Sequence, residues 1–223
     1  MKTRTLTTNL TQITRFRFVN AFLVREDDGF TLVDTTLGGA ADGLIAAANE
    51  AGAPIVRIAL THGHGDHIGS LDALKAKLPQ AQVLIPELDA RILAGEPVVE
   101  GKLPGSWKKD VKTQPDVRLQ AGDRVGSLEV VATPGHSPGH VAFLDTRDRS
   151  VIGGDIFTSY GSLQVSNHFS VPFPFAAMAT WDKAKDLEAA KTIRALGPSL
   201  LVVGHGPAIP HPADAMDKAI GKA

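Results

Sequence analysis

The sequence predicts a mixed α and β fold in a single domain over residues 1–223. Of its 223 residues, 43% are hydrophobic and 21% charged, which suits a domain with a substantial core. Short strand patterns come in groups separated by helical patterns, without strict strand–helix alternation. Neither a low-complexity segment nor a clear linker divides the chain.

The first half of the chain begins with a predicted hairpin. Residues 15–24 start with period-two alternation, and the turn-forming Asp27-Asp28-Gly29 leads into a return strand over residues 30–33. An Ala-rich helix follows over residues 40–51 and is closed by Gly52. The remaining elements of this half are a buried strand 55–60, a helix 68–78 stopped by Pro79, a strand 82–85 and a helix 87–93.

Two irregular stretches mark the second half. Residues 95–116 hold three prolines and three glycines with little periodicity, and loops this long are usually functional or mobile. Residues 157–179 are also irregular and rich in aromatic side chains. The regular elements predicted around them are strands 127–132, 141–144, 150–152 and 200–203 and helices 181–196 and 213–220.

Composition excludes several classes of protein. The formal net charge is −1 and no basic patch is interleaved with aromatics, so we expect no nucleic-acid partner. Without cysteine there is no disulfide, thiolate ligand or thiol nucleophile. No apolar run approaches the ~20 residues that span a membrane. The start stays polar through Thr14, so we expect no secretory signal and a cytoplasmic location, with a trimmed secreted form as the alternative.

The run from Thr61 to His67 is the most informative stretch. Imidazole and carboxylate are the ligands that zinc and similar divalent metals prefer. Four such side chains directly follow the apolar run 55–60: His62, His64, Asp66 and His67. The run predicts a metal site, and the alternative is a helix N-terminus with incidental histidines and Asp66 as its cap.

Three further polar residues each follow an apolar run and are flanked by glycine or proline: His136, Asp155 and His205. Each alone would suggest a turn or a helix cap. Ligands at strand ends of one sheet edge can converge, and the seven residues together exceed the needs of one tetrahedral metal. They suggest two metals, roughly 3.5–4 Å apart, that share a bridging carboxylate.

With these motifs the chain resembles the metallo-β-lactamase fold superfamily of metal-dependent hydrolases over roughly residues 16–210. Five motifs occur in the family's order: Asp34 after a strand, His62-Gly63-His64-Gly65-Asp66-His67, His136 in Thr-Pro-Gly-His-Ser-Pro-Gly-His, Asp155 in Gly-Gly-Asp, and His205 in Gly-His-Gly. The resemblance implies a four-layer αββα sandwich, in which two mixed sheets pack face to face with helices outside.

The resemblance also implies a role for each motif residue. One metal would be held by His62, His64 and His136, the other by Asp66, His67 and His205, with Asp155 bridging both. Asp34 would orient a ligand histidine through its other ring nitrogen. We expect two divalent ions, zinc first, with iron or manganese as alternatives.

Two metals that flank one water would lower its pKa towards ~7, which would give a bridging hydroxide at neutral pH. Catalytic roles then fall to Asp155, to Asp66 as a proton relay to the leaving group, and to Tyr160 as a donor to a substrate oxyanion. His168, Phe173 and Phe175 are candidate substrate contacts. Ordinary packing is the alternative for Tyr160 and the phenylalanines. For His140 we favour a structural hydrogen bond over metal ligation.

The expected activity is hydrolysis of a small ester-type substrate: a lactone, ester or thioester. The ligand set is similar to that of quorum-quenching lactonases, although Tyr160 lies further along than their pattern has it. Only about a dozen residues follow Pro210, so we expect no helical extension of the glyoxalase II type. A small-molecule substrate is the expected partner, and a homodimer through the aromatic stretch stays open.

Three alternatives use the same scaffold. A β-lactam hydrolase of the branch with a full His-x-His-x-Asp-His motif is the first. Iron-dependent oxygen or persulfide chemistry is the second, because imidazole and carboxylate suit both zinc and iron. A non-enzymatic binding module is the third, and it would be expected to lack ligands that this chain keeps.

Overall fold

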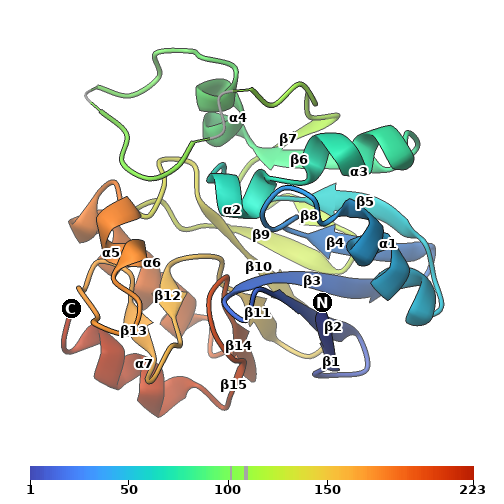
Figure 1. The fold of residues 1–223 in the computed structure, drawn as a ribbon. Helices are drawn as coiled ribbons and strands as arrows, with labels where there is room; N and C mark the ends of the chain where they lie inside the picture. The colour runs from blue at the N-terminus through green and yellow to red at the C-terminus, as the bar shows by residue number, and fades with distance from the viewer. Residues whose placement is uncertain (101, 108–109) are drawn as a thin grey trace. The chain divides into compact units, whose positions relative to one another are not determined.

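A computed structural model describes residues 1–100, 102–107 and 110–223 (Figure 1). The chain divides into two units, Met1–Glu96 with Ser106–Leu119 and Pro97–Gly105 with Gln120–Ala223. Each unit holds one large mixed sheet with its own helices, which confirms the predicted class of two mixed sheets flanked by helices. One domain over 1–223 stays a prediction. Among the described residues, no helix has the length and apolar character needed to cross a membrane.

The sheet of the first unit has seven strands in chain order. Strands β1 to β4 pair antiparallel, and β4 to β7 pair parallel. The strands are β1 (Lys2–Thr5), β2 (Leu10–Arg15), β3 (Val19–Glu26), β4 (Gly29–Val33), β5 (Ile55–Ala59), β6 (Gln82–Pro86) and β7 (Val117–Leu119).

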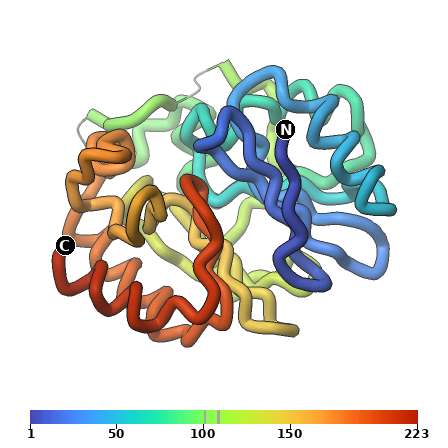
Figure 2. The backbone as a smooth tube through the Cα atoms, turned by 60° about the horizontal axis from the view of Figure 1, so that its bottom comes forward, coloured from blue at the N-terminus to red at the C-terminus, as the bar shows by residue number. Residues whose placement is uncertain are grey.

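The N-terminal part of this sheet differs from the sequence prediction. The expected strand over 15–24 is interrupted by a turn, because Phe16 and Arg17 adopt left-handed backbone angles (φ 50° and 67°) and end β2. The polar start instead forms β1 and β2, which Figure 2 shows as the dark-blue hairpin. Threonine is common in strands, so this polar, threonine-rich segment can form a hairpin without an apolar run.

The described part of this unit has four helices: α1 (Ala41–Glu50), α2 (Gly65–Ile68), α3 (Leu71–Lys77) and α4 (Glu87–Leu93). Leu44 of α1 and Leu71 and Leu74 of α3 pack with sheet residues such as Leu23 and Ile58 in one buried cluster. In place of the predicted helix 68–78, α2 ends at Ile68 and α3 begins at Leu71, because Ser70 leaves the helical backbone region (φ −103°, ψ 6°). A Cβ at Gly69 would lie 2.5 Å from Gly38 N, so the absence of a side chain there lets the two loops approach closely.

The sheet of the second unit has six strands in the order β15-β14-β11-β10-β9-β8. Only β11 and β14 are parallel neighbours. The strands are β8 (Arg124–Val125), β9 (Leu128–Ala132), β10 (Val141–Asp145), β11 (Ser150–Ile152), β14 (Leu200–Val202) and β15 (Ile209–Pro210), and β12 (Phe157–Thr158) and β13 (Gln164–Val165) form a separate pair.

Helices α5 (Phe175–Ala179), α6 (Lys183–Ala195) and α7 (Ala213–Ile220) complete the second unit. Figure 2 shows α6 and α7 as neighbouring orange and red coils, and Arg194 pairs with Asp217 between them at 2.7 Å. Ile193 and Met216 pack with Val151 and Leu201 in the core of this unit. The sheet and these helices therefore share one apolar layer.

Strand direction gathers the functional segments at one edge of each sheet. In the first unit Asp34 follows β4, His62 follows β5 and α4 follows β6, and these three strands are parallel. In the second unit β9, β11 and β14 all run in the same direction, so residues after their ends lie at the same edge. Those segments carry His136, Asp155 and His205.

Candidate metal centre

The histidine run of the first unit is a tightly held loop between β5 and α2. The backbone N–H of Gly63 donates to buried Asp89 on α4 at 2.8 Å, and the N–H of Gly65 donates to the Ser106 carbonyl at 2.6 Å. A Cβ at position 63 would lie 2.7 Å from the ring of Trp107, so a side chain there would displace this ring. These contacts fix the loop from which the histidines project.

Asp34 organises two of the histidines. Its carboxylate accepts hydrogen bonds from His67 Nδ1 at 2.9 Å and from the Thr61 hydroxyl at 2.8 Å. The hydroxyl proton of Thr61 is thus committed to Asp34, so Thr61 Oγ1 accepts from His62 Nδ1 at 3.0 Å. Both rings therefore carry their proton on Nδ1, and Nε2 keeps the lone pair that a metal needs.

The donors of this loop lie close together. The ligand atoms of His62 lie within 4.8 Å of those of His64 and of His67, and the same holds for Asp66 and His67. His62, His64 and His67 are buried, and the side chain of Asp66 is 30% exposed. The ring of Trp107 meets that of His64 edge to face at 5.1 Å. The first unit thus presents three imidazoles and one carboxylate in a compact group.

In the second unit, Asp155 lies between two histidines. Its Oδ2 is 3.5 Å from His136 Nε2 and 3.1 Å from His205 Nε2, and all three residues are buried. Zinc binds such donors at about 2.0–2.2 Å, so two ligands of one tetrahedral ion lie roughly 3.4 Å apart. The spacing and the donor types of this trio therefore fit divalent metal binding.

The loop that carries His136 is held by the chain before α6. The backbone N–H groups of Trp181 and Asp182 donate to the carbonyls of His136 and Gly135 at 3.0 and 2.9 Å. The Thr180 hydroxyl donates to the Ala176 carbonyl at 2.8 Å, so it accepts from His136 Nδ1 at 3.1 Å. His136, like His62, therefore keeps its Nε2 lone pair.

Asp186 on α6 packs directly beneath the same loop. A Cβ at Gly135 would lie 2.3 Å from the Asp186 backbone, so only glycine fits there. Burial raises the pKa of the Asp186 carboxyl to about 8, the Asn167 backbone N–H opposes this, and the Asp155 and Asp182 charges add to the rise. Asp186 is therefore a protonated acid near neutral pH.

His140, the second histidine of its motif, forms hydrogen bonds with both ring nitrogens. Its Nε2 accepts from the backbone N–H of Asp155 at 3.0 Å, and its Nδ1 lies 2.9 Å from the Thr133 hydroxyl. A ring nitrogen that accepts an N–H cannot carry a proton, so Nδ1–H donates to Thr133. This arrangement agrees with a structural hydrogen bond.

The aromatic candidates of the second unit form a stack beside His205. The ring of Phe173 lies 4.6 Å from His205 and 5.3 Å from Tyr160, and it meets Phe175 edge to face at 5.7 Å. Phe173 is buried, whereas Phe175 is 67% exposed. His168 is an exposed residue after β13, and its backbone N–H donates to the Val165 carbonyl.

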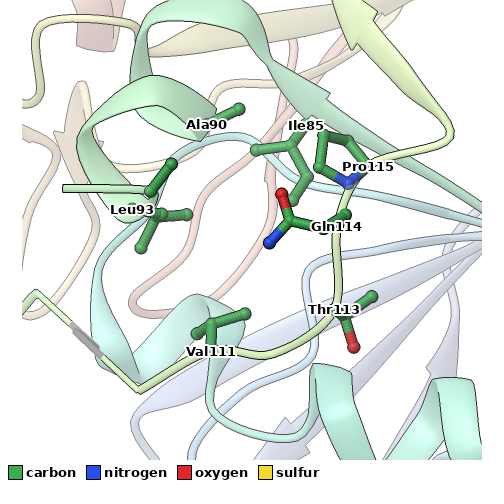
Figure 3. Close-up of a pocket in the computed structure, with 8 residues that line it drawn as sticks. Ile85, Ala90, Leu93, Val111, Thr113, Gln114 and Pro115 are labelled. Carbon is green, nitrogen blue, oxygen red and sulfur yellow. The ribbon is translucent and has the colours of Figure 1, made fainter. Parts of the chain in front are cut away.

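The long loop 95–116 contributes Trp107 to the surroundings of His64, although positions 101, 108 and 109 lie outside the described residues. Its later part lines a small cavity with α4, which Figure 3 shows between Leu93, Val111 and Pro115. The volume is about 10 Å³, room for one water at most. This cavity is too small for an organic substrate.

Sequence reasoning missed several residues that support the histidines. Thr61 could have been found, because it directly precedes His62 and follows a strand. Thr180 and Asp186 lie more than forty residues from His136, and only the tertiary fold brings them to it. Asp89 carries no motif of its own.

Comparison with known proteins places the chain in a family. The profile of the Metallo-beta-lactamase superfamily matches residues 14–205. The chain is 41% identical over 210 residues to the uncharacterized protein YobT of Bacillus subtilis (strain 168), covering 92% of this chain and 90% of that one. It is 32% identical over 122 residues to a hydroxyacylglutathione hydrolase of Rhodopseudomonas palustris (strain HaA2), covering 53% and 40%.

A solved structure gives the same result for the fold. TTHA1623, crystallised in a di-iron-bound form, superimposes with a TM-score of 0.68 and 27% sequence identity, covering 91% of this chain and 94% of that one. The profile match extends over most of the chain and includes every predicted ligand. The chain belongs to the metallo-β-lactamase superfamily.

Proposed function

We propose that the protein is a binuclear metal-dependent hydrolase, with zinc as the resident metal, that acts on a small ester-type substrate. One ion would be held by His62, His64 and His136, and the other by Asp66, His67 and His205, with Asp155 bridging. The observation that carries the proposal is the tautomer of the histidines. Hydrogen bonds to Thr61, Asp34 and Thr180 place a proton on Nδ1 of His62, His67 and His136, respectively, and leave Nε2 for a metal.

When bound, the two ions would supply Lewis acidity for a substrate carbonyl and a water of lowered pKa. The protein's own residues orient these partners. Asp34 and Thr180 hold the ligand rings at fixed angles. Asp66 keeps a partly exposed carboxylate that can take a proton from the attacking water and pass it to the leaving group. Tyr160 offers a phenol that can donate a hydrogen bond to a developing oxyanion.

Substrate selection is proposed to lie in residues 157–179. Phe173 contacts the ligand His205, and Phe175 extends this contact outward with a largely exposed ring. Exposed aromatic surface next to a ligand residue favours a substrate with an apolar group beside its ester-type carbonyl. His168 would contact the polar end of such a molecule. We propose a small molecule as the partner, because the net charge of −1 gives no attraction for nucleic acid. The proposed location is the cytoplasm.

Two relatives support specific variants of this function. The partial similarity to hydroxyacylglutathione hydrolases favours a thioester as the ester-type substrate. The di-iron form of TTHA1623 supports iron as the alternative metal, and with it oxygen chemistry in place of hydrolysis. The contact between the rings of Tyr160 and Phe173 favours lactone hydrolysis, because it places apolar surface beside a phenol.

A turnover panel tests the proposal. Wild-type protein with measured metal content is assayed on a homoserine lactone, an aryl ester, a glutathione thioester and nitrocefin. We expect turnover of at least one of the first three, and loss of it in His64→Ala and Asp155→Ala with the circular dichroism spectrum unchanged. His211→Asn is the matched control, because His211 is exposed and has a left-handed backbone (φ 47°) that asparagine tolerates.

Two results would count against the proposal. Wild-type turnover by His64→Ala or Asp155→Ala would show that the ligands assigned here do not carry the reaction. Turnover of nitrocefin alone would replace the ester-type substrate with a β-lactam.

A further inference from the structure

The geometry points to His140 as a positioning residue that fixes the bridging carboxylate Asp155 relative to the ligand loop of His136. His140 is not a metal ligand in this account, and its action is through Asp155. The inference rests on the proposed metal site in one respect only, that Asp155 is a ligand.

Strand order explains why His140 can reach Asp155. β10 lies between β9 and β11 and runs antiparallel to both. The first residue of such a middle strand lies at the same sheet edge as the ends of its two neighbours. His140 directly precedes β10, His136 follows β9 and Asp155 follows β11. The histidine thus lies between the two ligand segments.

The ring of His140 bridges those segments through both nitrogens. Thr133 belongs to the loop after β9, and its Oγ1 accepts a hydrogen bond from His140 Nδ1–H at 2.9 Å. Across β10, Nε2 accepts the backbone N–H of Asp155 at 3.0 Å. The loop itself is closed by the Thr133 N–H, which donates to the His140 carbonyl at 3.0 Å. Both ring bonds are buried, and His140 is only 1% exposed.

The bond to Asp155 orients the turn in which this residue lies. Gly153 and Gly154 precede it, and backbone hydrogen bonds at 2.8 Å hold them: the Gly153 N–H donates to the Val202 carbonyl, and the Gly154 carbonyl accepts from the Gly204 N–H. The bond to His140 holds the next N–H, that of Asp155 itself, and so orients the residue whose carboxylate lies 3.5 Å from His136 Nε2 and 3.1 Å from His205 Nε2. Losing the acceptor would leave this buried N–H without its His140 bond and let the Asp155 peptide shift.

The test compares His140→Gln with His140→Leu in metal binding, independently of turnover. Glutamine can accept the Asp155 N–H through Oε1 and donate to Thr133 through Nε2, whereas leucine fills a similar volume without either bond. Zn²⁺ affinity is measured by competition with a chromophoric chelator, and Co²⁺ is added separately to record its visible absorption bands. We expect about a 10–100-fold loss of Zn²⁺ affinity and altered Co²⁺ bands in His140→Leu. His140→Gln should restore most of the affinity.

Equal Zn²⁺ affinity and identical Co²⁺ bands in wild type and His140→Leu would overturn the inference. If His140→Leu does not fold, Thr133→Val and Thr133→Ser replace it, because valine removes only the acceptor of the Nδ1 proton. A loss of affinity in Thr133→Val that Thr133→Ser restores supports the inference, and wild-type affinity in both contradicts it. Wild-type protein that binds no Zn²⁺ at all would instead contradict the proposed function.

Discussion

Asp34 is the residue on which most of the first unit's ligand geometry depends. One buried carboxylate accepts from His67, from the Thr61 hydroxyl and from the Thr61 backbone N–H, the last at 2.8 Å. Through Thr61 it also sets the tautomer of His62. Its left-handed backbone (φ 62°) costs a non-glycine residue about 1–2 kcal/mol, a strain that functional sites commonly keep.

Replacing Asp34 with asparagine should weaken metal binding at both proposed ions. The NH₂ group of asparagine would face His67 Nδ1–H or the Thr61 hydroxyl, which now donate hydrogen bonds to the Asp34 carboxylate. His67 and His62 would then lose their fixed tautomers. We expect about a 10–100-fold loss of Zn²⁺ affinity in a chelator competition. Asp28→Asn is the control, because exposed Asp28 pairs with Arg57 away from the histidines. Unchanged affinity in Asp34→Asn would contradict this role.

At the scale of elements, the sequence predicted what depends on local pattern. The helices 87–93 and 213–220 were predicted with the bounds that the structure gives. The turn at Phe16 and Arg17 could not be predicted in this way, because the alternating side chains around it favour a strand. The positive φ angles of Phe16 and Arg17 are imposed by the pairing of β2 with β3. The histidine motifs located the donors, whereas Thr180 and Asp186 required the packing of α6 against the His136 loop.

Helix α6 carries a testable consequence of that packing. Unfolded, Asp186 ionises near the ordinary value of 3.8, whereas folded it keeps its proton until about pH 8. Between these values the native state holds a proton that the unfolded state has lost, so its free energy of unfolding falls as pH rises. The fall is at most about 1.4 kcal/mol per pH unit for one group.

Asp186→Asn removes this dependence. In chemical denaturation of metal-free protein, the stability of the variant relative to wild type should rise from pH 4 to pH 8 and then level off. Asp217→Asn is the comparison, because the Arg194 guanidinium lowers the pKa of Asp217 below the ordinary 3.8, so this carboxyl is ionised in both the folded and unfolded states at higher pH. The stability of Asp217→Asn relative to wild type should therefore stay nearly constant from about pH 5 to pH 8 and rise only as the pH falls below the ordinary value. A difference between wild type and Asp186→Asn that does not vary with pH would show that native Asp186 is ionised.

At the scale of the whole molecule, two sheets each end in a group of metal-type donors, and the family to which the chain belongs uses such groups for divalent ions. Membership and fold could be predicted from five ordered motifs. The substrate could not, because specificity depends on loops whose aromatic residues follow no motif. Phe173 beside His205 is known only from the tertiary structure.

The metal content of protein purified without chelators tests the central claim most directly. Elemental analysis by plasma mass spectrometry, with the chain quantified by amino-acid analysis, should give two divalent ions per chain, mainly zinc. The expected two ions per chain follow from the seven donor residues. In three of these, His62, His67 and His136, the hydrogen bonds leave Nε2 for a metal. One iron and no zinc per chain, or no bound metal, would contradict the account.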